Sequence, residues 1–116
     1  MSFAYLDETR AAQCAKLDSM ILSRMNRIRE RLRTLPERLR GQELVILVGP
    51  RFDRGIEISV ITAEEAKQRP IISELVFPTV EPGRLLVFAW NHSGFSAFRT
   101  VDPRMHLQND SPGGAP

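Results

Sequence analysis

The spacing of apolar residues divides the chain into two parts. From Asp7 to Leu39, apolar side chains recur every three to four residues, and eight of the nine heptad a and d positions are apolar. The a positions are Ala11, Asp18, Met25, Leu32 and Leu39, and the d positions are Cys14, Ile21, Ile28 and Leu35. This period of about 3.5 residues predicts one long amphipathic helix that lays a narrow stripe against a partner surface.

Local signals limit this helix at both ends. Asp7 favours a start there, because negative charge complements the exposed N–H groups of a first helical turn. Pro36 disfavours the helical conformation before it, so two outcomes are open: a kinked continuation, or a second short helix beginning at the capping-box pair Thr34 and Glu37. Gly41 is expected to end the helical part.

After the helix the apolar period changes to two, which is typical of β-strands. Five strands are predicted, over residues 43–49, 56–60, 71–77, 84–91 and 95–101. Thr62 and Glu65 have the spacing of a capping box, which predicts a short helix over residues 63–68 that stops before Pro70.

The predicted fold class is α+β: a long N-terminal amphipathic helix, then an antiparallel meander of about five strands, with one short helix inserted after the second strand. A chain of 116 residues suits a single domain. We expect this domain over 1–107, with the helix over about 7–39 and the sheet over about 43–101. Residues 108–116 are expected to form a disordered tail, because they offer nothing to bury.

The length of the helix argues for a second copy of the chain. A straight helix from Asp7 to Leu35 spans about 43 Å, whereas five strands side by side are only about 24 Å wide. One sheet cannot cover such a helix, and the commonest cover for the remaining stripe is a homodimer. Ala11 and Ala15 are the candidate contacts, because small side chains allow close approach and arginines flank the later half of the stripe.

The predicted sheet is apolar on both faces, and one helix can cover only one of them. The second face includes Phe88, Trp90 and Phe98. Either the short helix or a partner must cover it, so these three residues are candidates for an apolar interface.

Positive charge is concentrated in the second half of the long helix. The whole chain carries a net charge of +2, but residues 24–40 hold seven arginines against two glutamates, a local charge of +5. The candidate binding residues are Arg24, Arg27, Arg31, Arg33 and Arg38. Arginine pairs bidentately with phosphate and carboxylate, so this block suits nucleic acid or an acidic protein surface. A solvated face with Glu30 and Glu37 as intrahelical partners is the third interpretation.

Little in the sequence indicates catalysis or a cofactor. Cys14 is the single cysteine, which excludes an intrachain disulfide, and no HExxH or paired CxxC pattern supports a metal site. Ser93 and His92 are adjacent in an expected tight turn without a GxSxG motif. An active site would need Asp53, His92, Asp102 and His106 to meet through folding. We therefore expect neither a cofactor nor a metal.

The chain is expected to be cytoplasmic and to have no membrane partner. Acidic residues at positions 7 and 8 stand where a signal peptide needs an apolar core. The longest apolar run, from Leu44 to Val48, is too short to span a bilayer.

These observations lead to three hypotheses of function. The first is a small non-enzymatic binding protein, a regulator or inhibitor, that is homodimeric and contacts an acidic partner protein through an apolar sheet face and the basic helix. The alternative is a nucleic-acid-binding protein that places the arginine-rich helix on phosphates. The third is a small enzyme whose active site carries no recognisable motif.

Overall fold

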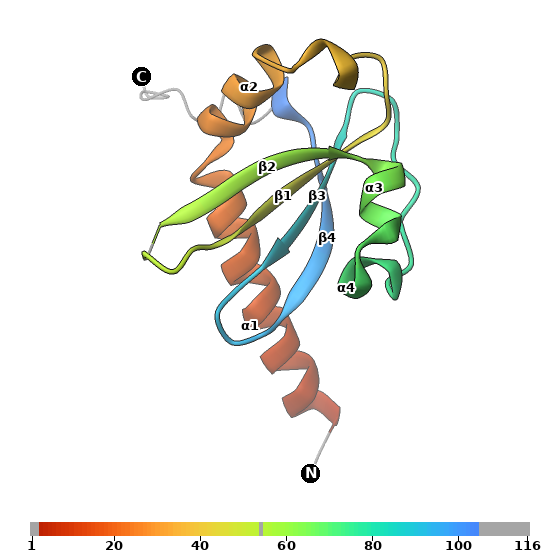
Figure 1. Cartoon of the computed structure of the whole chain (residues 1–116). Helices are drawn as coiled ribbons and strands as arrows, with labels where there is room; N and C mark the ends of the chain where they lie inside the picture. The colour runs from red at the N-terminus through yellow and green to blue at the C-terminus, as the bar shows by residue number, and fades with distance from the viewer. Residues whose placement is uncertain (1–2, 54, 105–116) are drawn as a thin grey trace.

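The computed structural model describes residues 3–53 and 55–104 (Figure 1). Helices α1 (Phe3–Leu22) and α2 (Met25–Arg33) come first, followed by the 3-10 turn η1 (Glu37–Leu39). The strands are β1 (Leu44–Pro50), β2 (Ile56–Thr62), β3 (Leu85–Trp90) and β4 (Ser96–Val101), and the short helices α3 (Ala63–Gln68) and α4 (Pro70–Ser73) lie between β2 and β3. The predicted tail over 108–116 lies outside the described residues, and so does His106.

The α+β class is confirmed, but the predicted five-stranded antiparallel meander is wrong. The four strands form one mixed sheet in the order β2-β1-β3-β4. Strands β1 and β2 pair antiparallel, as do β3 and β4, whereas β1 and β3 pair parallel. A parallel pair needs a crossover connection, and here α3 and α4 lie in the segment that carries the chain from β2 past β1 to β3.

The strand predicted over residues 71–77 does not form. Pro70 occupies the first turn of α4, where its missing N–H costs nothing and its fixed φ suits a helix. Ile72 is buried in this helix, and Leu75 and Phe77 pack beside it, while Val76 is 91% exposed. The apolar run therefore covers the sheet as a separate layer instead of extending it.

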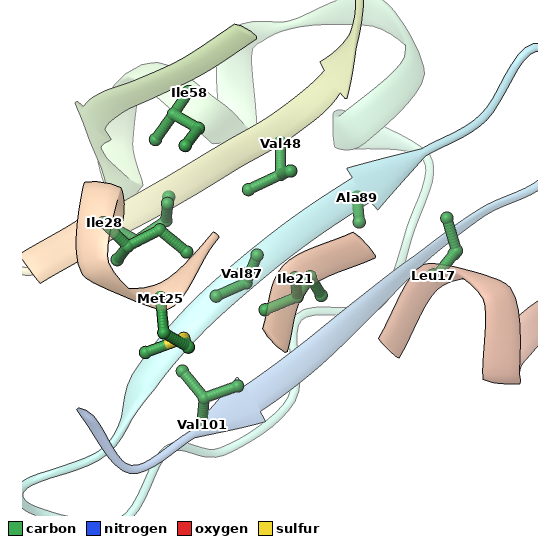
Figure 2. Close-up of a cluster of buried hydrophobic side chains, with 10 residues drawn as sticks. Leu17, Ile21, Met25, Ile28, Val48, Ile58, Val87, Ala89 and Val101 are labelled. Atoms are coloured by element: carbon green, nitrogen blue, oxygen red, sulfur yellow. The ribbon is translucent and has the colours of Figure 1, made fainter. Parts of the chain in front are cut away.

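Helices α1 and α2 cover one face of the sheet (Figure 2). Leu17, Ile21, Met25 and Ile28 are fully buried. The last three are a or d positions of the predicted heptad stripe, whereas Leu17 lies beside it. All four pack on the sheet residues Ile46, Val48, Ile58, Val87, Ala89 and Val101. This cluster forms the larger of two apolar cores, and it fixes α2 beside β2.

The predicted N-terminal helix is present, but it is not continuous: it begins at Phe3, is broken at Ser23 and Arg24, and ends at Arg33. The Ser23 hydroxyl donates a hydrogen bond to the Met20 carbonyl at 3.1 Å, which competes with the helical hydrogen-bond pattern. The break changes the direction of the stripe: α1 packs against β3 and β4, whereas α2 packs against β2. After α2, the Thr34 hydroxyl bonds the Glu30 carbonyl, and no side chain caps η1.

The chain covers the second sheet face itself. Val45, Leu47, Ile61, Leu86 and Phe88 form a core with Ala66 of α3 and Ile72 of α4. Of the two covers that the sequence left open, the short helices are therefore the one that the fold uses. The molecule has three layers, with the sheet between α1/α2 and α3/α4 (Figure 1).

The predicted capping box at the start of α3 is confirmed. The Glu65 N–H donates to the Thr62 hydroxyl at 3.0 Å, and the Thr62 N–H donates to a Glu65 carboxylate oxygen at 3.1 Å. These hydrogen bonds from the Thr62 backbone and then its hydroxyl lower the pKa of Glu65 from its ordinary value of 4.5.

We expect Thr62→Val to raise the pKa of Glu65 toward 4.5 without restoring it fully, because the Thr62 N–H remains a donor. In the natural protein, the stabilising effect of Glu65 is present above pH 4.5 and is lost as the pH falls through its lowered pKa. An NMR titration of the Glu65 carboxyl carbon measures this shift. Thr34→Val is the matched control, since the Thr34 hydroxyl bonds a carbonyl, and an unchanged Glu65 pKa in Thr62→Val would contradict the assignment.

Candidate functional site

The arginines of α2 lie on two sides of the helix. Arg27 and Arg31 are one turn apart on the same side, and both are exposed. Arg33 lies on another side and pairs with Glu30 at 3.0 Å. Arg29 donates to the Pro103 carbonyl at 3.4 Å. The candidate block of arginines is therefore not one surface.

Arg24 belongs to the junction between α1 and α2. Its guanidinium donates to the Met20 carbonyl at 3.3 Å and to the Ser23 hydroxyl at 2.7 Å. Its Nε is buried and finds no hydrogen-bond partner within the described residues. These contacts close the C-terminal end of α1, so Arg24 is not presented to a ligand as Arg27 and Arg31 are.

A groove of about 450 Å³ lies between α2, η1 and β2, and we call it the basic groove. Arg27 and Arg31 line it from α2, Arg38 from η1, and Arg51 from the hairpin that joins β1 to β2. Residues 56–60 of β2 form the opposite wall. The fold thus gathers four guanidinium groups from three segments of the chain.

The basic groove is positively charged but not uniformly so. Within the described part of the chain, neither Arg27 nor Arg31 forms an ion pair with a carboxylate. Arg51 pairs with Asp53 at 3.3 Å, and Glu57 lies in the β2 wall of the groove. The unpaired guanidinium groups make the α2 side of the groove the part best suited to carboxylate or phosphate.

The β2 wall also supplies an apolar floor. Ile58 is buried against the core of α1 and α2, and Ile56 and Val60 are half-buried beside it. A ligand in the groove therefore meets apolar side chains on one side and guanidinium groups on the other.

The predicted apolar interface lies on the other side of the sheet. Phe88 is buried and Trp90 and Phe98 are half-buried, and the three rings form one cluster with centroid distances of 5.7 and 5.2 Å from Phe88. Trp90 lies across Gly49, where any Cβ would overlap the indole ring. A pocket of about 500 Å³ between α4 and this cluster leaves Ile71 69% exposed.

The predicted dimer contacts, Ala11 and Ala15, are both exposed. Figure 1 shows the N-terminal end of α1 projecting past the turn between β3 and β4. The Asn91 side-chain amide at the start of that turn donates a hydrogen bond to the Gln13 side chain at 2.9 Å. This bond holds α1 against the sheet at the point where the helix passes beyond it.

Two of the four residues considered for catalysis lie together. Asp53 and His92 line one hollow of about 650 Å³. They come together because β1 and β3 are parallel neighbours, so their C-terminal ends lie side by side. Asp102 follows β4 at the opposite end. No three His, Cys, Asp or Glu side chains gather as metal ligands in residues 3–53 and 55–104.

None of the helices within the described ranges is both long and apolar enough to cross a lipid bilayer. In comparisons with protein-family models, curated proteins and solved structures, no match to this chain was found.

Proposed function

We propose that this chain is a small non-enzymatic binding protein whose basic groove takes an acidic segment of a partner protein. The observation that carries the proposal is the convergence of Arg27, Arg31, Arg38 and Arg51 on one groove. Such a groove recognises carboxylates through bidentate hydrogen bonds, and occupying a partner's segment is a means of regulating or inhibiting it. The cytoplasmic location remains part of this proposal.

Two features favour an acidic protein segment over nucleic acid. The β2 wall is apolar at Ile56 and Val60, which suits the apolar and aliphatic surface of a peptide and offers no partner to a continuous run of phosphates. Trp90 lies on the opposite sheet face, so its ring cannot stack on a base bound beside the α2 arginines.

Nucleic acid is the second candidate because of the hairpin that joins β1 to β2. Phe52 is fully exposed there, directly after Arg51. An exposed ring beside a guanidinium group is a stacking platform for an unpaired base.

A direct binding measurement separates the two candidates. A fluorescent peptide of alternating glutamate and threonine and a fluorescent single-stranded RNA of equal charge are titrated with the protein at several salt concentrations. We expect the peptide to bind more tightly than the RNA at physiological salt. Tighter binding of the RNA would instead favour the nucleic-acid function. In that case the log of the affinity should fall with the log of the salt concentration with a slope of about −0.7 per phosphate contact.

Homodimerisation is a separate part of the proposal. We expect a dimer at micromolar concentration and expect Ala11→Glu or Ala15→Glu to weaken it, because a charge there opposes close helix approach. Sedimentation velocity measures the effect. Ala11→Gln and Ala15→Gln introduce a side chain of the same size without the charge and are the controls. A monomer at every concentration would contradict the predicted dimer. The helix break at Ser23 and Arg24 would then explain the result, because α1 is shorter than the single helix from which the dimer was inferred.

A further inference from the structure

The two edges of the sheet, β2 and β4, differ in how their outward backbone groups are used. On β2, the Ala63 N–H donates to Glu43 and, at the other end of the ladder, the Arg51 N–H donates to Gly55, both at 2.9 Å. Bonded residues alternate along an antiparallel pair. Residues 57, 59 and 61 therefore bond to β1, whereas Ile56, Ile58 and Val60 direct their N–H and C=O groups to the free edge.

Two outward carbonyls of the β4 edge are covered by arginine side chains. The same alternation, fixed by the Asn91 N–H donating to Phe95 at 3.1 Å, directs the carbonyls of Phe98 and Thr100 outward. Arg99 donates to the Phe98 carbonyl at 2.9 Å, and Arg84 donates to the Thr100 carbonyl at 3.0 Å. Charged side chains at an edge protect it from pairing with another strand.

The β2 edge has no such protection. Within residues 3–53 and 55–104, no group hydrogen-bonds to the outward N–H and C=O groups of Ile56, Ile58 and Val60. These same residues line the basic groove, so the open edge and the guanidinium groups of α2 lie along one surface. Unpaired strand backbone beside positive charge is a template for an anionic extended chain.

We propose that the acidic partner segment binds by adding a strand to β2. Its backbone pairs with the outward groups of Ile56, Ile58 and Val60, and its carboxylates on the α2 side reach Arg27 and Arg31. This inference rests on the proposed function and specifies how the segment is held. A second copy of this chain fits the edge less well, because pairing β2 with β2 brings the arginines of two grooves together.

The test uses backbone methylation of the glutamate–threonine peptide. Two variants carry N-methyl groups on alternate residues, one on the glutamates and one on the threonines. Alternate residues of a strand direct their N–H groups to opposite edges, so only one variant presents its methyl groups to β2. We expect that variant to bind roughly tenfold more weakly or worse, and the other to bind like the parent peptide.

The outcomes separate this inference from the proposed function. If both methylated peptides bind as tightly as the parent, strand addition is overturned while binding of an acidic segment stands. If the parent peptide does not bind at all, the proposed function fails and the inference fails with it.

A substitution in β2 tests strand addition independently of the peptide. Val60→Pro removes an outward N–H without removing a bond to β1, a position where an edge strand accepts proline. Val60→Thr keeps the N–H and the branched side chain and is the matched control. We expect several-fold weaker peptide binding for Val60→Pro alone, with thermal melts confirming that both variants fold. Equal affinity in two folded variants would overturn strand addition, and the methylated peptides decide the matter if Val60→Pro does not fold.

Discussion

Ile28→Ala is expected to lower the free energy of unfolding by about 2–5 kcal/mol. Ile28 has no exposed surface, and it packs from α2 into the core that includes Ile58 and Val87 (Figure 2). Removing its side chain beyond Cβ leaves a cavity at a site enclosed by both helix and sheet. Urea denaturation at neutral pH measures the loss.

Leu22→Ala is the control for this change, because Leu22 is 42% exposed at the end of α1. Its loss should be well below that of Ile28→Ala, and half-buried Leu32→Ala should lie between the two. Losses below about 0.5 kcal/mol for both Ile28→Ala and Leu32→Ala would mean that α2 is not part of the core.

The double change Arg27→Glu, Arg31→Glu is expected to weaken binding of the acidic peptide by at least about tenfold. Both side chains are exposed, so the fold should survive. Reversal of charge on one wall of the groove should slow association more than it speeds dissociation, because such charges mainly steer the encounter. Stopped-flow mixing with the fluorescent peptide measures both rates.

Arg33→Glu provides the control for net charge. Arg33 is on the same helix but pairs with Glu30 outside the groove. It should change affinity much less than the double change does. An equal effect per charge would indicate attraction by net charge without a specific site. Arg24 is not included in the charge reversal, because it hydrogen-bonds the end of α1. Its replacement would alter the stability of the fold as well as the charge.

Several elements could be predicted from local sequence. The stripe positions Ile21, Met25 and Ile28 are buried as their spacing indicates, and Thr62 and Glu65 form the capping box that starts α3. These features depend on contacts within a few turns of chain and on one apolar face, which periodicity reports directly.

The topology could not be predicted from local sequence, because it depends on contacts between distant segments of the chain. The break at Ser23 and Arg24 contains neither proline nor glycine, and the helices on its two sides cover different strands. The run over 71–77 is equally apolar as a covering helix or as a strand. One signal was present: β1 and β3 are nearly continuous apolar runs, which is typical of central, parallel strands buried on both faces.

The candidate site shows the same division. A helical projection separates Arg27 and Arg31 from Arg33, so that part could be read from sequence. The approach of Arg51 to α2 and the edge position of β2 require the tertiary fold.

The most direct test of the basic groove is to map the peptide on the protein by NMR. Uniformly ¹⁵N-labelled protein is titrated with the glutamate–threonine peptide, and backbone amide shifts are followed to saturation. Binding in the groove predicts the largest changes at Ile56, Ile58 and Val60 of β2 and at Arg27 and Arg31 of α2. Binding in the groove would be contradicted by changes confined to the surface around Trp90. It would also be contradicted if no amide shifts changed at concentrations that saturate the titration of the fluorescent peptide.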